Sequence, residues 1–162
     1  MKGFLCSHIV KCKERNMHIE KIGIESLEKV KTAMVKIFSK EPWNDVWSEE
    51  QLHLYVLELV ENRNALPLGL YEDGDLVGIS LGRVKHWCDG TEYWIDEFGI
   101  LPEKQGIGIG TKFLHEIECY LKKHHIFVMV LLTDRSTPAY HFYQKNGWID
   151  KTEQAFLEKR IF

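Results

Sequence analysis

The sequence predicts a single domain of mixed α/β (α+β) class, with a central mixed sheet of about six to seven strands flanked by about four helices. Three observations predict this class. The 162 residues suffice for one domain with a hydrophobic core but not for two ordinary ones. Stretches with helical and strand periodicity alternate along the chain. Three consecutive strand patterns precede a glycine-rich turn, after which a helix connects to a further strand, so an antiparallel meander is followed by a parallel crossover.

The domain is expected to begin at Met17, after an N-terminal extension of residues 1–16. "MHIEKIG" alternates polar and apolar residues and predicts a first strand. "IESLEKVKTAMVKIFSK" repeats apolar residues at three- and four-residue steps, which predicts an amphipathic helix that Pro42 follows. Ser48 and Gln51 form a capping box, so a second helix is expected from about Glu49.

The middle of the chain predicts three consecutive strands. "ALPLGLYEDGDLVGISLGRV" contains two of them around the turn Asp73-Gly74, which is a strong hairpin signal. Asp89 and Gly90 form the next turn, and "TEYWIDEFGIL" is the third strand. These strands supply the antiparallel part of the sheet.

The last third of the chain predicts two helices and three strands. A helix follows "QGIGIG", and the continuous apolar run "FVMVLLT" is typical of a strand buried on both faces. "TPAYHFYQKNG" predicts a short helix between Pro138 and Gly147, and "WIDKTEQAFLEKRIF" predicts two closing strands. Four apolar residues near the end could pair subunits in a homodimer or complete the sheet: Phe156, Leu157, Ile161 and Phe162.

Composition narrows the classes of function. Apolar residues make up 44% and charged residues 28%, which is globular composition, and the net charge of -3 does not indicate a nucleic-acid partner. No apolar run reaches the length of a membrane span, and the N-terminus does not resemble a signal peptide. The scattered cysteines predict free thiols, a cytoplasmic location and no metal site.

The glycines of "QGIGIG", at positions 106, 108 and 110, permit three interpretations. A Walker loop requires Gly-Lys-Ser/Thr, and this sequence has Gly110-Thr111-Lys112 instead. A dinucleotide fold requires GxGxxG after the first strand of a βαβ unit, with Asp134 as a ribose contact, but this turn follows a meander. The third interpretation is a pyrophosphate held by main-chain N–H groups at the start of the following helix.

The third interpretation gains support from a resemblance. Gln105-x-x-Gly108-x-Gly110 after "FGILPEK" resembles the acetyl-coenzyme A motif of the GNAT superfamily of N-acetyltransferases. "AYHFYQKNGW" resembles the next signature of that superfamily, and the order of elements from Met17 to Phe162 is similar to it as well. The nearest resemblance is to aminoglycoside 6'-N-acetyltransferases and polyamine N-acetyltransferases. It implies that an amine attacks acetyl-CoA, a co-substrate, directly in a ternary complex without an acyl-enzyme intermediate. No metal is expected.

The resemblance also implies roles for individual residues. Asp96, nine positions before Gln105, corresponds to the acidic residue that acts as the base, directly or through water. Glu97 is the second candidate, although regular alternation would place the two carboxylates on opposite faces unless a bulge intervenes. Tyr143 corresponds to the general acid that protonates the leaving thiolate. Ser136 stands where many members have an asparagine that contacts pantetheine.

The expected coenzyme contacts share a position along the gap that the superfamily opens between two strands. Backbone N–H groups near Gly99 would polarise the thioester carbonyl, and the turn would hold the pyrophosphate. The full expected set is Phe98, Gly99, Ile100, Gln105, Gly106, Ile107, Gly108, Ile109, Gly110, Thr111, Ser136 and Tyr143.

The resemblance implies an acceptor site beside the segment between the first two helices, which is "FSKEPWNDVW" in this sequence. This segment is rich in aromatic and acidic residues, which suits an amine cation. The expected contacts are Phe38, Glu41, Trp43, Asp45, Trp47 and Asp96, with Trp87, Asp89 and Glu92 as further rim residues. The preferred acceptor is therefore a small polycationic amine, either an aminoglycoside or a polyamine. The alternatives are an amino-acid or peptide amine, or a regulatory module that binds acyl-CoA without catalysis.

Overall fold

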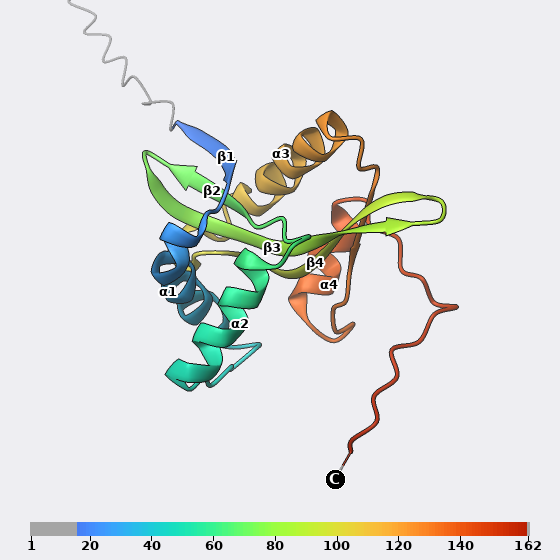
Figure 1. Cartoon of the computed structure of the whole chain (residues 1–162), viewed down its shortest axis with the longest axis horizontal. Helices are drawn as coiled ribbons and strands as arrows, with labels where there is room; N and C mark the ends of the chain where they lie inside the picture. The colour runs from blue at the N-terminus through green and yellow to red at the C-terminus, as the bar shows by residue number, and fades with distance from the viewer. Residues whose placement is uncertain (1–15, 162) are drawn as a thin grey trace, which may run out of the picture.

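The computed structural model describes residues 16–161, which form one mixed sheet covered by helices on both faces (Figure 1). Within these residues there are five strands, four α-helices and two short 3-10 helices. In chain order they are β1 (Met17–Lys21), η1 (Ile24–Ser26), α1 (Leu27–Phe38), α2 (Glu49–Glu61), β2 (Leu68–Glu72), β3 (Asp75–Trp87), β4 (Gly90–Ile100), η2 (Pro102–Lys104), α3 (Ile109–Lys123), β5 (Val128–Leu131) and α4 (Pro138–Lys145).

The sheet has the order β1-β2-β3-β4-β5, so every strand lies beside its neighbour in the sequence. The first four strands pair antiparallel, and β5 pairs parallel to β4 after the crossover through α3. The hairpin predicted at Asp73-Gly74 and the parallel crossover are both confirmed. The β3–β4 hairpin is the longest pair in the sheet, and its end extends beyond the other strands (Figure 1).

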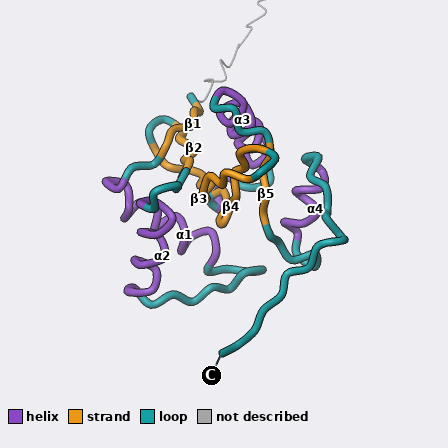
Figure 2. The backbone as a smooth tube through the Cα atoms, turned by 45° about the vertical axis from the view of Figure 1, so that its right-hand side comes forward, coloured by secondary structure: helices purple, strands orange, loops and turns teal. Residues whose placement is uncertain are grey.

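Two apolar cores lie on opposite faces of the sheet. Helices α1 and α2 cover one face, where Met34 and Val56 are fully buried against Ile79 of β3. Helix α3 covers the other face, where Phe113 is fully buried against Tyr93 of β4. Figure 2 shows α3 on the opposite side of the strands from α1 and α2, with α4 beside β5. Strand β4 therefore lies between the two cores.

Local signals explain where these elements begin. The hydroxyl of Ser48 accepts a hydrogen bond from the N–H of Gln51 at 3.1 Å, which satisfies one free donor at the start of α2. At the centre of the sheet, the buried hydroxyl of Tyr93 donates to the carbonyl of Leu66 at 3.0 Å and lies 3.0 Å from the hydroxyl of Ser80. These bonds attach β4 to β3 and to the segment that leads into β2.

Two strand predictions are wrong. The segment 148–161 contains no strand, so the sheet has five strands within residues 16–161 rather than six or seven. Alternation alone does not make a strand, because a strand also needs a partner, and residues 151–161 are all exposed. The run "FVMVLLT" forms β5, but β5 is half-exposed rather than buried on both faces because it is the last strand of the sheet.

Several predictions fall partly outside the described residues. Apart from Asn16, the expected N-terminal extension lies outside them, as do Cys6, Cys12 and Phe162. Cys88 and Cys119, which are described, are free thiols. None of the helices within residues 16–161 combines the length and apolar character needed to cross a membrane.

Candidate active site

A bulge in β4 brings the two candidate carboxylates together. Leu81 of β3 pairs with Glu97, and Gly82 pairs with Ile95, so Asp96 is an extra residue in β4. Gly82 permits this close approach, because a Cβ at that position would lie 2.2 Å from the carbonyl oxygen of Trp94. The side chain of Ile95 packs with the α3 core, whereas Glu97 contacts α2. Asp96 and Glu97 therefore do not follow the regular alternation of faces along a strand, because the bulge lies between their neighbours.

Glu97 is held on the α2 face by an aromatic pair. The hydroxyl of Tyr55 donates a hydrogen bond to Glu97 Oε1 at 2.7 Å. The ring of Tyr55 stacks on Trp47, with ring centroids 5.2 Å apart and an angle of 12° between the planes. Burial raises the pKa of Glu97 to about 7 against the opposing effect of the Tyr55 hydrogen bond, and the charges of Asp45 and Asp96 raise it further. Glu97 therefore titrates near neutral pH.

Asp96 has a different environment. Both of its carboxylate oxygens lie within hydrogen-bonding distance of Nη1 of Arg83, on the neighbouring strand. The ion pair is half-exposed, so Asp96 remains accessible beside Glu97. The charge of Asp96 also contributes to the raised pKa of Tyr55, which agrees with its position near Glu97. The charges of Asp45 and Asp96 thus raise the pKa of Glu97, and the charges of all three acids raise the pKa of Tyr55.

Strands β4 and β5 separate immediately after the bulge. Their parallel pairing runs from Glu92 with Val128 to Ile95 with Leu131 and ends there. Residues 98–100 continue to pair with β3, but within residues 16–161 they have no partner strand on the β5 side. The edge of β4 next to the two carboxylates therefore presents main-chain groups to a gap. A gap between these two strands is what the family resemblance implied.

The glycine turn lies at the far end of that edge. Gly106 and Gly108 have φ values of +76° and +84°, a left-handed conformation that glycine adopts without a steric penalty. A Cβ at either position would meet no atom within 4 Å, so the space beside the turn is open. Helix α3 begins directly after Gly108, and its first turn contains no acidic residue. Its free N–H groups and the positive end of its dipole therefore suit an anion.

The other two glycines of the region pack closely. A Cβ on Gly110 would lie 3.2 Å from Cζ of Phe142 on α4, and one on Gly99 would lie 2.5 Å from Cγ2 of Ile37 on α1. The side chain of Gln105 donates to the carbonyl of Ile100 at 2.8 Å, which ties the turn to the end of β4. Ile109 is buried in the α3 core, whereas Ile107 and Thr111 are exposed. The turn is thus held in place at Gln105 and Gly110, while the space beside Gly106 and Gly108 is open.

Tyr143 lies beside the same gap. Its ring on α4 packs against Phe98 of β4, with centroids 6.2 Å apart, and against Trp148 at 5.4 Å. Burial and then the charge of Glu97 raise the pKa of Tyr143 well above its usual range. Its hydroxyl has no hydrogen-bond partner among residues 16–161. Tyr143 is therefore a protonated hydroxyl close to Glu97.

Ser136 has local partners. Its hydroxyl donates to Oδ1 of Asp134 at 2.8 Å, and its N–H donates to the same oxygen at 2.7 Å. Both bonds lower the pKa of Asp134, and the bond from the Ser136 N–H has the larger effect. The Ser136 side chain thus stabilises the turn before α4, and its expected contact with pantetheine stays a prediction.

The expected acceptor wall divides into buried and exposed parts. Phe38 is a core residue with Trp43 edge-on to it, at a centroid distance of 6.2 Å. Trp47 is half-buried, and its buried Nε1–H has no hydrogen-bond partner within residues 16–161. Asp45 is half-buried and Glu41 is exposed. The structure thus brings Asp45 and Trp47 to the carboxylates, while Phe38 mainly supports the wall from the core.

The further rim residues lie on the β3–β4 hairpin and already bind a cation. Nζ of Lys85 lies 4.2 Å from the ring centroid of Trp87 and 4.3 Å from that of Trp94. Glu92 accepts a hydrogen bond from Nε1 of Trp94 at 2.7 Å. Asp89 is exposed at the turn. These contacts stabilise the projecting hairpin.

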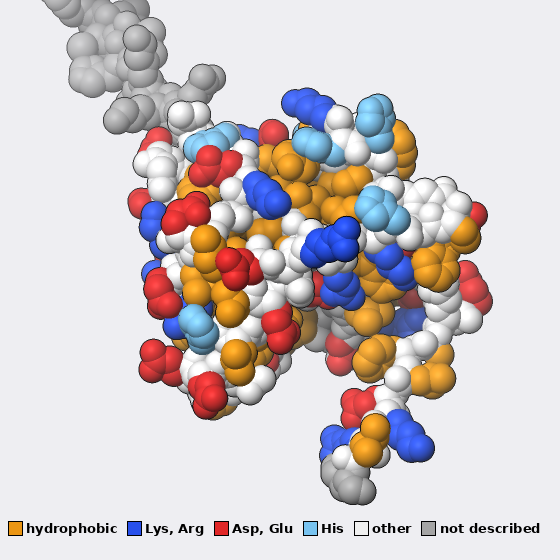
Figure 3. Space-filling model, viewed as in Figure 1, with side chains coloured by type: hydrophobic (Ala, Val, Ile, Leu, Met, Phe, Trp, Pro, Cys, Tyr) orange, Lys and Arg blue, Asp and Glu red, His pale blue; other side chains and the backbone are white. Residues whose placement is uncertain are grey.

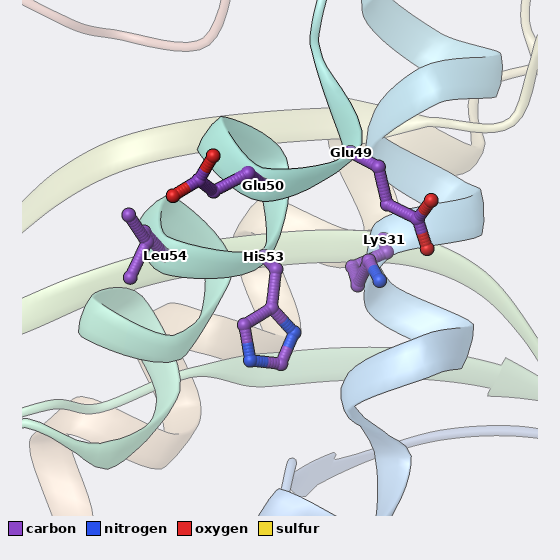
Figure 4. A pocket seen from close by; sticks show the side chains of 5 residues that line it. All are labelled: Lys31, Glu49, Glu50, His53 and Leu54. Atoms are coloured by element: carbon purple, nitrogen blue, oxygen red, sulfur yellow. The ribbon is translucent and has the colours of Figure 1, made fainter.

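Two surface hollows are separate from this region. One, of about 450 Å³, is lined by Lys31 of α1 and by four residues of α2, namely Glu49, Glu50, His53 and Leu54 (Figure 4). The other, of about 610 Å³, lies between α1, the β2–β3 turn and η2. Neither is lined by the glycine turn, by Asp96 or Glu97, or by Tyr143.

Sequence reasoning missed two residues of the site, Tyr55 and Arg83. Tyr55 lies three positions after Leu52, on the side of α2 that packs on the sheet, so the helical pattern could have indicated an inward hydroxyl. Arg83 pairs across the strands with Trp94, and its contact with Asp96 arises from the bulge. No pattern in the sequence marks that contact.

Comparisons with known proteins agree with this arrangement. The family model described as "Acetyltransferase (GNAT) family" matches residues 28–148, well over half of the chain. No curated protein matches the chain by sequence. Many solved structures match as well. Three examples match over nearly their whole length, and each has low identity to this chain.

The first is aminoglycoside N-acetyltransferase AAC(6')-Iy in complex with CoA, with 15% identity, a TM-score of 0.71, and 93% of this chain and 99% of that chain covered. The second is aminoglycoside acetyltransferase meta-AAC0020 from an uncultured soil metagenomic sample, in complex with sisomicin, with 14% identity, a TM-score of 0.70, and 90% and 97% covered. The third is a GNAT family acetyltransferase from Staphylococcus aureus, with 16% identity, a TM-score of 0.68, and 89% and 98% covered. The match to the family model and these shared folds lead to one conclusion: the chain belongs to the GNAT family and is an acetyltransferase.

Proposed function

We propose that the chain is an acetyl-CoA-dependent N-acetyltransferase whose acceptor is a small polycationic amine, such as an aminoglycoside or a polyamine. The observation that carries this proposal is the bulge at Asp96. It makes Asp96 an extra residue of β4 next to Glu97, and the charges of both acids act on Tyr55, at the point where β4 loses its β5 partner. An acid-lined wall beside an open strand edge suits an ammonium acceptor next to an extended ligand.

The residues of the glycine turn fit the coenzyme. The turn has open space beside Gly106 and Gly108, and the free N–H groups of α3 face no acidic side chain in its first turn. A pyrophosphate requires such donors, and glycines allow the main chain to approach it. The free edge of residues 98–100 offers further main-chain donors. Acetyl-CoA, when bound, supplies the acetyl group as an activated thioester.

Similar proteins support the choice of ligands. The AAC(6')-Iy structure is a complex with CoA, and the meta-AAC0020 structure is a complex with sisomicin. With identities of 15% and 14%, these likenesses concern the fold, so the ligands are part of the proposal. The acidic wall of Asp45, Asp96 and Glu97 is the independent reason to favour a cationic acceptor.

Glu97 is proposed as the proton acceptor. An alkylammonium group must lose a proton before its nitrogen can attack, and a general base is most effective when its pKa lies near the working pH. The pKa of about 7 for Glu97 meets this requirement. The hydrogen bond from Tyr55 fixes the orientation of the Glu97 carboxylate. Sequence reasoning favoured Asp96 for this role, but Asp96 already accepts hydrogen bonds from Arg83, so we propose that its carboxylate helps to orient the acceptor instead.

Tyr143 is proposed as the proton donor to the leaving thiolate. Its raised pKa keeps the hydroxyl protonated at neutral pH, and its ring lies against Phe98 at the edge of the gap. Main-chain N–H groups of residues 98–100 would stabilise the negative charge that develops on the carbonyl oxygen. In the overall reaction a C–N bond forms and the C–S bond breaks. Glu97 takes up the first proton of the ammonium group, Tyr143 protonates the sulfur, and the second nitrogen proton, which is lost as the amide forms, returns to the Tyr143 oxygen.

The proposal is tested by an acceptor screen that measures thiol release from acetyl-CoA. The panel contains aminoglycosides, polyamines, amino acids and peptides with a free α-amine. We expect the polycationic amines to give the highest kcat/KM. Release with peptides or amino acids alone would contradict the proposed acceptor class.

A second measurement separates catalysis from binding. Acetyl-CoA should raise the Tm of the protein as its concentration exceeds Kd, because a ligand that binds only the folded state stabilises it. A rise in Tm without thiol release for any amine would mean that the chain only binds the coenzyme. No rise in Tm at saturating acetyl-CoA would contradict the coenzyme assignment itself.

A further inference from the structure

The β3–β4 hairpin carries a row of charged and aromatic side chains along one face. Arg83 of β3 lies opposite Trp94 of β4. Lys85, two residues further along β3, lies opposite Glu92. Partners in an antiparallel pair point to the same face of the sheet. Tyr93, which lies between the two β4 residues, is buried in the α3 core, so the row is on the face turned away from α3.

The row leads away from the proposed base. Glu97 lies on the same side of the sheet, because its carboxylate accepts a hydrogen bond from Tyr55 of α2. Trp94 comes three residues before Glu97 in β4, which corresponds to about 10 Å along the strand. The hairpin extends beyond the other strands (Figure 1), and Figure 3 shows Lys and Arg side chains next to hydrophobic ones where it leaves the sheet.

The ammonium group of Lys85 already occupies one place in this row. Its Nζ lies 4.2 Å from the ring centroid of Trp87 and 4.3 Å from that of Trp94. Glu92 accepts a hydrogen bond from Nε1 of Trp94 at 2.7 Å, which orients that ring. Aromatic faces gathered around an ammonium group are also the means by which proteins bind alkylammonium ligands. The rings therefore form a cation site that a side chain of the same chain fills.

The guanidinium of Arg83 occupies a second place, on Asp96. Only Nη1 contacts the carboxylate, and the other N–H groups of Arg83 have no hydrogen-bond partner among residues 16–161. The Arg83 side chain is 46% exposed, so water screens this ion pair. Trp87, in the other place, is 54% exposed. The fold encloses neither internal cation, so each can exchange with a cation from solution.

We propose that Arg83 and Lys85 occupy the places of two ammonium groups of the acceptor, which displaces both side chains when it binds. This inference rests on the proposed function and assigns the hairpin face to the part of the acceptor that does not react. The amine that reacts has lost its proton when it attacks, so it cannot replace either internal cation. The site therefore favours an acceptor with at least two ammonium groups in addition to the reacting amine.

The two internal cations compete with the acceptor. A ligand binds only those molecules whose site is open, so occupation by a side chain raises the apparent Kd. Removing an internal cation should therefore strengthen the binding of a polycation. If Lys85 and Arg83 only stabilised the hairpin, their removal would leave this Kd unchanged or raise it.

Calorimetric titration with spermine and with kanamycin, two ligands with four amino groups each, tests the competition without any acetyl transfer. Arg83→Gln and Lys85→Met should each lower the Kd by about 3–10-fold, as expected for a site that its own side chain fills most of the time. Lys123→Met, at an exposed position of α3 on the other side of the sheet, removes the same charge and is the matched control. At about 0.15 M salt its long-range effect is screened, so its Kd should equal that of the wild type.

A second substitution tests whether the gain arises at the rings. Trp87→Ala in the Lys85→Met background should cancel the gain, because the incoming ammonium group loses one of its two aromatic faces. Circular dichroism should be the same for all variants, since Trp87 and Lys85 lie on the projecting hairpin outside both cores. A gain that persists without the Trp87 ring would overturn the assignment of this place.

Three other results would overturn the inference: an unchanged or raised Kd in either Arg83→Gln or Lys85→Met, an equal gain in Lys123→Met, or no binding of spermine or kanamycin by any of these proteins. Thiol release from acetyl-CoA tests the proposed function separately. A wild type that acetylates polycationic amines, with no gain in binding for either variant, would retain that function and refute the displacement of Arg83 and Lys85.

Discussion

Replacing Glu97 with Gln should make the protein more stable at alkaline pH while removing most of its activity. The substitution removes the charge but keeps an oxygen that can accept the hydrogen bond from Tyr55. Burial raises the pKa of Glu97 from 4.5 to about 7, so the folded protein resists ionising this group while the unfolded chain ionises it readily. The free energy of unfolding of the wild type therefore falls as pH rises from about 4.5 to about 7, because the unfolded state releases this proton more easily.

The magnitude follows from the size of the shift. A difference from 4.5 to about 7, at about 1.4 kcal/mol per pKa unit, gives about 3 kcal/mol of destabilisation above pH 8. At about 2–4 °C per kcal/mol for a chain of this size, Glu97→Gln should raise Tm by roughly 6–12 °C at pH 8. The gain should approach zero at pH 4, where Glu97 is protonated in both states. Glu61→Gln, at an exposed position in the helix that carries Tyr55, is the control and should show no such pH dependence.

Two assays measure the effect. Differential scanning calorimetry from pH 4 to pH 8 follows the difference in Tm between the variant and the wild type, and thiol release follows kcat/KM. Loss of a general base should lower kcat/KM by about 10²–10⁴-fold. A stability gain that is the same at pH 4 and pH 8, or the absence of any gain, would refute the raised pKa. Unchanged turnover would refute Glu97 as the base while leaving the stability argument intact.

Three further results are expected from single substitutions. Asp96→Asn should raise KM for a polycationic amine more than it lowers kcat. Steady-state kinetics would measure both constants, with a monoamine as the reference acceptor. A loss confined to kcat would instead assign the role of base to Asp96. Tyr143→Phe should lower kcat by about 10²-fold without changing the Kd for acetyl-CoA in calorimetry, and unchanged kcat would mean that water protonates the thiolate. Gly82→Ala should destabilise the fold by about 2–4 kcal/mol in urea unfolding, because the added Cβ would lie 2.2 Å from a carbonyl oxygen, whereas Gly108→Ala, in open space at positive φ, should cost only about 1–2 kcal/mol. Equal costs at the two glycines would contradict the close approach at the bulge.

Local signals in the sequence predicted the elements that local interactions determine. The capping box at Ser48, the turn at Asp73-Gly74 and the glycines after β4 each correspond to an observed boundary or turn. Such signals act through hydrogen bonds or backbone conformations within a few residues. The order of elements as far as α4, and from it the antiparallel and parallel pairing, could therefore be predicted without knowledge of the packing.

The relative positions of Asp96 and Glu97 could not be predicted in this way. They depend on a shift of register against β3, which Gly82 permits on the neighbouring strand. The raised pKa of Glu97 likewise depends on α2, which provides Tyr55 from far away in the sequence. The closing strands failed as a prediction for a related reason. A strand pattern such as that of residues 148–161 describes which faces are apolar, but not which edge is available for pairing.

The contact between Gly110 and Phe142 links two positions whose substitutions must compensate each other. A Cβ at residue 110 would come within 3.2 Å of Phe142, and the residue after Phe142 is Tyr143. An alanine at position 110 would thus press on α4, the helix that carries the Tyr143 hydroxyl. Homologues with a residue larger than glycine at position 110 should therefore have a side chain smaller than phenylalanine at position 142. Gly110 thus allows α3 and α4 to lie close together. Covariation of positions 110 and 142 in homologous sequences would reveal that constraint.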